Sequence, residues 1–229
     1  PFLNKLEQNT PAAKQVVDRV AKSDYAQLFE EVWGPVSLDS KKAGLVATYE
    51  KIGRSIAAYE RSQSVAPFTS KYDYYLRGKA ILTDQEAHGL ALFNYKGRCA
   101  ACHSSSPGPK GQPPLFTDFS YANLGLPRNP QNSFYNAPTG TNPQGADWVD
   151  SGLGGFLASA GYPESVWASE LGKFKVPTLR NVDKRPAPGF VKSYGHNGVF
   201  KSLEEITHFY NTRDTAPWGA PEVPVNVNS

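Results

Sequence analysis

The stretch Gly97-Arg-Cys-Ala-Ala-Cys-His103 decides how this sequence is interpreted. It holds both cysteines of the chain, Cys99 and Cys102, with two residues between them and His103 directly after the second. This is the attachment pattern of haem c. The two thiols add across the two vinyl groups of the haem, and a tight turn brings both sulfurs to one edge of the ring. The imidazole of the histidine then lies under the ring and binds the iron.

Other uses of such a cysteine pair fit this sequence less well. A structural zinc site needs four ligands, commonly from two such pairs, and the chain has no further cysteine. A thioredoxin-like redox pair is expected after a strand at the start of a helix. Here the pair follows a helical pattern and precedes a loop, and a disulfide across two residues would be strained. The sequence therefore predicts one covalent haem c, held by Cys99, Cys102 and His103.

The composition sets broader limits. The chain has 229 residues, of which 39% are hydrophobic, as is normal for a globular protein with a real core. The net charge is +3 with the charges mixed along the chain, which argues against a nucleic-acid partner. No run of 18 apolar residues exists, so no transmembrane segment is predicted.

The spacing of apolar residues predicts a mainly α fold with long loops and few strands. Helical patterns cover residues 11–22, 24–33, 40–62, 68–78, 83–97, 163–174 and 202–212. Glycine and proline cluster between residues 104 and 163, which is too rich in helix breakers for long elements. A loop region of this length is uncommon unless it wraps something large, such as a buried cofactor. We expect a cytochrome c-type haem domain with long Pro/Gly-rich loops, and a boundary near residues 63–67.

The second axial ligand cannot be methionine, because the chain contains none. On the helix expected at 202–212, helical spacing predicts a buried stripe that ends at Tyr210 and includes Leu203, Ile206 and Thr207. His208 lies about 200° around the helix from Tyr210, so only one of the two can face the haem. Two interpretations stay open: either the Tyr210 phenolate binds the iron, or Tyr210 packs in the core and the iron is five-coordinate or water-bound.

Several motifs, taken in order, resemble the second half of bacterial dihaem cytochrome c peroxidases, a family that includes the MauG-type enzymes of methylamine utilisation. The resemblance runs over nearly the whole chain and rests on Leu90-Ala-Leu-Phe93, Gly97-Arg-Cys-Ala-Ala-Cys-His103, Phe174-Lys-Val-Pro-Thr-Leu-Arg-Asn181, Tyr194-Gly-His-Asn-Gly198 and Ser202-Leu-Glu-Glu205. It implies that residues 65–229 form the carboxy-terminal, electron-transfer haem domain. Residues 1–64 would be the helical tail of the preceding, peroxide-reactive haem domain, with a second haem upstream.

The resemblance also implies roles for single residues. Tyr210 follows His196 by 14 residues, the spacing at which the peroxidases place a methionine ligand and MauG-type enzymes place a tyrosine. Glu7, in Leu6-Glu-Gln-Asn9, matches the position of an acidic residue beside the peroxide site, where it would transfer a proton. Arg180 would lie near a haem propionate or the inter-haem region. His196 is a candidate for the wall of the haem pocket.

The sequence departs from the family in two ways. The family's first Cys-x-x-Cys-His is absent, and the chain ends where the family usually continues into a final helix, so we expect a trimmed or incomplete chain. An insertion at 183–192 precedes the Tyr194–Gly198 turn, in the neighbourhood that supplies the family's calcium site, so calcium is doubtful here.

Three functions follow from these observations. The first is a periplasmic dihaem peroxidase, with hydrogen peroxide as substrate and a small cytochrome c or cupredoxin as electron donor. The second is a MauG-like high-valent haem oxidase of a protein substrate, which an anionic tyrosine ligand would suit. The third, which applies if the chain is complete, is a non-enzymatic monohaem electron carrier. Haem c is attached outside the bacterial cytoplasmic membrane, so the expected location is the periplasm, and a homodimer is compatible with each function.

Overall fold

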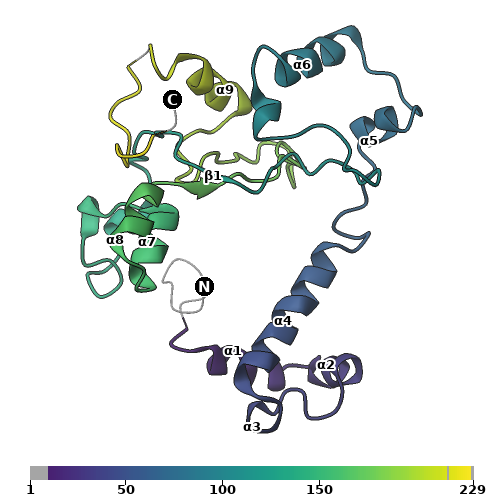
Figure 1. Cartoon of the computed structure of the whole chain (residues 1–229), viewed down its shortest axis with the longest axis vertical. Helices are drawn as coiled ribbons and strands as arrows, with labels where there is room; N and C mark the ends of the chain where they lie inside the picture. The colour runs from purple at the N-terminus through teal and green to yellow at the C-terminus, as the bar shows by residue number, and fades with distance from the viewer. Residues whose placement is uncertain (1–9, 216, 228–229) are drawn as a thin grey trace. The chain divides into compact units, whose positions relative to one another are not determined.

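The computed structural model describes residues 10–215 and 217–227, and the chain forms two compact units, Pro1–Ala80 and Ile81–Ser229. Both units consist mainly of helices and loops, and one small sheet is present in the described residues (Figure 1). This confirms the predicted fold class. The assignment of residues 1–64 and 65–229 to two different haem domains stays a prediction.

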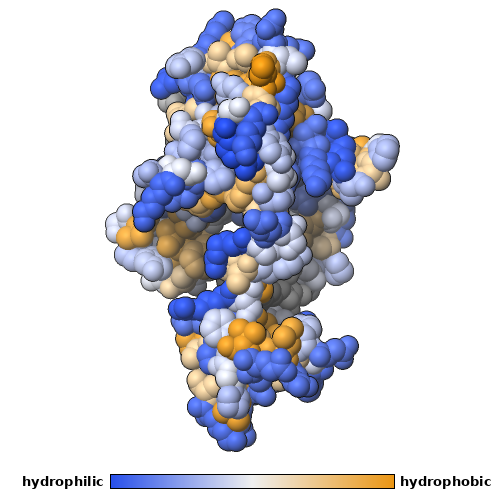
Figure 2. All heavy atoms as spheres, turned by 90° about the vertical axis from the view of Figure 1, so that its right-hand side faces the viewer, coloured by the Kyte–Doolittle hydropathy of each residue, from blue (hydrophilic) through white to orange (hydrophobic). Residues whose placement is uncertain are grey.

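The first unit is helical in its described part. Its elements are α1 (Ala13–Ala21), α2 (Ala26–Trp33), α3 (Ser40–Ala43), α4 (Leu45–Glu60) and α5 (Lys71–Leu76). Helices α1 and α4 pack closely, and the core between the helices is formed by Val17, Phe29, Leu38 and Ile52. On the face drawn in Figure 2, apolar side chains also gather on the surface of this unit, in the lower part of the view.

The single helix expected over residues 40–62 is two helices in the structure. Gly44 has a φ of +82° and separates α3 from α4. This conformation suits glycine, because a side chain would be strained at positive φ. Of the apolar residues along α4, Ile52 is buried, whereas Ile56 and Tyr59 near the end of the helix are exposed.

The second unit contains short helices around long loops. Its elements are α6 (Asp84–Asn94), η1 (Cys99–Ala101), β1 (Tyr121–Ala122), η2 (Ser133–Asn136), η3 (Gly145–Asp147), α7 (Gly152–Ser159), α8 (Glu164–Trp167), η4 (Ala168–Glu170), β2 (Phe174–Lys175) and α9 (Leu203–Thr212). Strands β1 and β2 are antiparallel, with Tyr121 opposite Lys175 and Ala122 opposite Phe174. The core of this unit is formed by Leu126, Tyr194, Phe200 and Phe209.

Helix α7 lies inside the stretch that looked like loop from its glycine content. A Cβ atom at Gly154 would lie 2.4 Å from the backbone nitrogen of Leu171, so glycine is required there by the close approach of another segment. The need for glycine at this position comes from a distant segment of the chain, so the neighbouring sequence does not reveal it. No helix in the described part of the chain is long and apolar enough to cross a membrane.

Candidate functional site

The Cys-x-x-Cys-His segment folds as one tight turn directly after α6. Thr83 begins α6 with a capping box, which fixes the start of the helix that leads to the turn. The backbone N–H of Gly97 donates to the carbonyl of Leu92, and a Cβ at this position would lie 2.9 Å from the same oxygen. The glycine before the cysteines therefore lets the chain turn back sharply at the end of the helix.

The turn itself presents both thiols to one region. Residues Cys99–Ala101 form a single 3-10 turn, and the backbone N–H of His103 donates to the carbonyl of Cys99 over 2.8 Å. Both cysteines are unpaired and exposed. Partial burial raises the pKa of the Cys99 thiol. Two free thiols on one turn are the donor set that thioether attachment of a haem requires.

His103 is held in one orientation by a backbone carbonyl. Its Nδ1 lies 2.8 Å from the carbonyl oxygen of Phe116. Because a carbonyl only accepts hydrogen bonds, Nδ1 carries the proton and Nε2 presents a free lone pair. A histidine that binds a metal through one nitrogen typically donates from the other in this way. The half-buried imidazole thus fits the role of an iron ligand.

The carbonyl that His103 binds belongs to a residue in an uncommon conformation. Phe116 has a φ of +53°, which costs an aromatic residue on the order of 1–3 kcal/mol and persists only where the surroundings enforce it. The ring of Phe93 packs edge-on against Phe116, with centroids 6.1 Å apart. The Arg180 guanidinium lies over the same ring, and Arg180 Nε donates to the carbonyl of Pro114. The structure therefore places Arg180 beside the segment that holds His103.

Tyr210 does not lie on the buried stripe of α9, and that prediction is wrong. The buried side is formed by Leu203, Ile206 and Phe209, and Phe209 is 1% exposed. Tyr210 is displaced about 100° around the helix from Phe209 and is 48% exposed. The predicted stripe took the residues three, four and seven positions after Leu203. In the structure every third residue, namely Leu203, Ile206 and Phe209, faces the core.

Tyr210 nevertheless lies near the attachment turn. Removal of its hydroxyl from water raises the pKa of Tyr210, and the neighbouring Cys99 and Cys102 thiols raise it further. The electrostatic influence of both thiols shows that the three side chains share one region of the second unit. Ligation of iron by Tyr210 stays a prediction.

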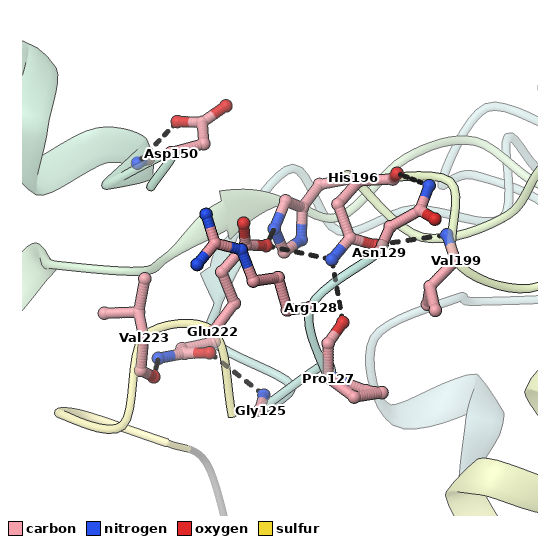
Figure 3. A network of polar contacts seen from close by, with 12 residues as sticks. Gly125, Pro127, Arg128, Asn129, Asp150, His196, Val199, Glu222 and Val223 are labelled. Atoms are coloured by element: carbon pink, nitrogen blue, oxygen red, sulfur yellow. Dashed lines mark hydrogen bonds and ion pairs between the residues drawn. The ribbon is translucent and has the colours of Figure 1, made fainter. Parts of the chain in front are cut away.

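His196 belongs to a separate polar cluster around a buried carboxylate (Figure 3). Its ring stacks flat on Phe174 with centroids 3.7 Å apart, and its Nε2 lies 3.2 Å from Oε2 of Glu222. Asn197 and Tyr135 also donate to Glu222, whose side chain is 2% exposed. Burial opposes ionisation of this carboxyl, but the hydrogen bonds from His196 and Asn197 hold its pKa below the usual range.

The sequence analysis did not single out Glu222. It lies 26 residues after His196, a separation that matches no helical or strand period. None of these contacts of His196 involves the turn at Cys99–His103, so its predicted place in the wall of the haem pocket stays a prediction.

Two further expectations concern Glu7 and a calcium site, and both depend on which residues the structure describes. Glu7 lies outside them. Within residues 10–215 and 217–227, no group of three or more His, Cys, Asp or Glu side chains could hold a metal ion.

Taken together, the free thiols and the oriented histidine, on a mainly helical scaffold, form the donor set expected of a c-type cytochrome, and haem attachment at these residues stays a prediction. Comparison with known proteins then gives the family. The family model for di-haem cytochrome c peroxidase matches residues 1–81. The chain is 33% identical to the methylamine utilization protein MauG of Paracoccus denitrificans, an alignment that covers 100% of this chain and 56% of that protein. The chain belongs to the dihaem cytochrome c peroxidase and MauG family.

Other relatives agree with this assignment. A cytochrome-c peroxidase of Denitromonas iodatirespirans is 29% identical over 71% of this chain and 41% of its own length. The crystal structure of the diheme peroxidase BthA from Burkholderia thailandensis matches 100% of this chain and 54% of its own chain, with a TM-score of 0.71 and 30% identity. A tyrosine-to-methionine variant of the same peroxidase matches with a TM-score of 0.72. The chain thus spans about half the length of these relatives.

Proposed function

We propose that this chain is the electron-transfer part of a bacterial dihaem peroxidase. Its haem c, bound through Cys99, Cys102 and His103, would pass electrons to a peroxide-reducing haem upstream. The observation that carries the proposal is the pairing of two free, exposed thiols on one turn with a histidine oriented by the carbonyl of Phe116.

Each residue of this set has a separate task. Cys99 and Cys102 would hold the haem edge through thioether bonds, and the imidazole of His103 would bind the iron. Phe116 holds the imidazole ring at one angle and makes His103 a more basic ligand by accepting its Nδ1 proton in a hydrogen bond. When bound, haem supplies an iron that alternates between the ferric and ferrous states and so carries one electron at a time.

Tyr210 is the proposed sixth ligand. Its place near both thiols and the absence of methionine support this role. An anionic phenolate favours the ferric state and lowers the reduction potential. Such a ligand suits a second candidate function, a MauG-like oxidase of a protein substrate, which the 33% identity to MauG over the full length of this chain also favours.

The remaining parts of the proposal concern the whole protein. A small cytochrome c or cupredoxin would donate electrons, and hydrogen peroxide would be the substrate. Glu7 would transfer protons beside the peroxide-reducing haem. The protein would act in the periplasm, where haem c is attached, and a homodimer is compatible with this function.

Counting haems in the full-length gene product distinguishes the candidates. A pyridine haemochrome assay against protein concentration should give two haems per full-length protein, together with peroxide-dependent oxidation of a reduced donor. A single haem without peroxide turnover would leave the monohaem electron carrier, and covalent oxidation of a protein substrate would favour the MauG-like oxidase.

A further inference from the structure

The carbonyl that His103 contacts, that of Phe116, belongs to one of two extended segments that lie side by side. We call residues 114–117 the strap and residues 176–180 the clamp. They continue from the β1/β2 pair, whose last backbone hydrogen bond on the side of the strap runs from Val176 N to Ser120 O over 2.8 Å. Beyond this bond the two segments stay side by side, although the regular strand pairing has ended.

Two prolines and two residues with positive φ prevent the regular strand pairing from continuing. Pro114 and Pro177 have no backbone N–H, so neither can donate to a ladder. Phe116 and Phe119 have φ values of +53° and +62°, which turn their carbonyls away from the direction that a strand requires. The strap must therefore be held by something other than main-chain pairing.

Beyond the paired strands, side-chain hydrogen bonds to backbone carbonyls hold the strap and the clamp together. Thr117 is buried, and its hydroxyl donates to the carbonyl of Val176 over 2.6 Å. From the other side, the Thr178 hydroxyl donates to the carbonyl of Leu115 over 2.5 Å, and Arg180 Nε donates to the carbonyl of Pro114 over 2.8 Å.

The bonds from the clamp meet the strap immediately before Phe116. The carbonyls of residues 114 and 115 are fixed by Arg180 and Thr178, and the carbonyl of Phe116 is the acceptor for His103 Nδ1. The backbone N–H of Arg180 also donates to the Thr178 hydroxyl, which aligns the two clamp residues with each other. The positive φ of Phe116 thus stands in a segment whose neighbours are tied on both sides.

We infer that Thr178 and Arg180 are positioning residues that set the reduction potential of the bound haem, by fixing the Phe116 carbonyl against the Nδ1 proton of His103. The inference rests on the proposed binding of haem c through His103. A strong hydrogen bond to this carbonyl gives the ligand more imidazolate character and stabilises ferric iron. Loosening the strap weakens the bond, so the potential rises.

The cleanest test replaces Thr178, because it is exposed and carries no charge. Thr178→Val keeps the shape and removes the donor, whereas Thr178→Ser keeps the donor. A matched control is Thr215→Val, which removes an exposed hydroxyl that bonds the carbonyl of Thr212 within its own turn. Arg180→Lys is the second clamp variant, because it preserves the positive charge near the haem but loses the planar Nε–H donor.

The measurement is the midpoint potential of the holoprotein, with the ferric absorption spectrum and thermal unfolding recorded alongside. We expect an upward shift of the potential in Thr178→Val and Arg180→Lys, and the wild-type value in Thr178→Ser and Thr215→Val. Equal potentials in Thr178→Val and wild type would overturn the inference, even if the variant unfolded at a lower temperature. Failure of the wild type to hold covalent haem would instead count against the proposed function, so the two failures are distinguishable.

Discussion

Replacement of Glu222 by alanine should destabilise the second unit strongly. The carboxylate is 2% exposed and accepts hydrogen bonds from Tyr135, Asn197 and His196 at 3.1, 2.9 and 3.2 Å. It also joins distant parts of the chain, because these donors lie 87, 25 and 26 residues away from Glu222. Truncation would leave three polar side chains, of which Tyr135 and Asn197 are partly buried, without their common acceptor.

The magnitude follows from the type of contact. Hydrogen bonds to a charged group contribute roughly 1.5–3 kcal/mol each, so the loss of three partly exposed ones should cost roughly 3–5 kcal/mol in total. For a protein of this size, each kcal/mol lowers the melting temperature by about 2–4 °C, so Glu222→Ala should lower it by roughly 6–20 °C. Glu222→Gln keeps the volume and one acceptor, and should cost roughly 1–3 kcal/mol because charged hydrogen bonds become neutral ones.

The effect of Glu222→Gln should depend on pH. The folded structure lowers the pKa of Glu222 below its ordinary value of 4.5. The ionised carboxylate therefore stabilises the fold above about pH 4.5, and this contribution is lost as the pH falls through the folded-state pKa. The difference in stability between wild type and Glu222→Gln should be full near pH 7 and shrink in acid.

Calorimetry of the holoprotein at pH 7 and in acid provides the assay. The matched control is Asp18→Asn, which breaks an exposed ion pair with Lys14 and should cost only about 0–1 kcal/mol. If Glu222→Ala melted within about 2 °C of the control, the argument for a stabilising buried carboxylate would be refuted.

Three further predictions concern the haem chemistry. His103→Gly should disrupt iron coordination and be partly rescued by added imidazole, whereas an unchanged ferric spectrum would point to another histidine as the ligand. Glu7→Gln in the full-length protein should lower peroxide turnover by about 10²-fold or more with a smaller change in peroxide binding, as for loss of a general acid–base group, and wild-type turnover would remove Glu7 from the mechanism. Tyr210→Met should raise the reduction potential and Tyr210→Phe should increase cyanide affinity; if neither changed, Tyr210 would not be a ligand.

The sequence predicted what depends on neighbouring residues. The turn at Cys99–His103, the helix that leads to it and the mainly helical fold all follow from local spacing and side-chain chemistry. The facing of α9 was wrong, since Phe209 rather than Tyr210 enters the core. The stripe on a ten-residue helix is compatible with more than one alignment, and only the packing partners Leu126 and Trp218 decide between them.

Long-range polar contacts were beyond prediction for a different reason. The acceptor of His103 lies 13 residues away, and the clamp contacts span 63 and 66 residues. These bonds end on backbone carbonyls, which every residue carries, so no residue type marks the acceptor. Phe116 gives no sign of its positive φ in the sequence, where glycine or asparagine would be expected.

The central claim is that Cys99 and Cys102 bind haem c covalently, and acid–acetone extraction tests it most directly. The wild-type protein, expressed with haem c attachment machinery, should keep its haem in the protein pellet after extraction. The double variant Cys99→Ala, Cys102→Ala should release its haem into the acetone. Haem that stays attached to the double variant, or is released from the wild type, would contradict the account.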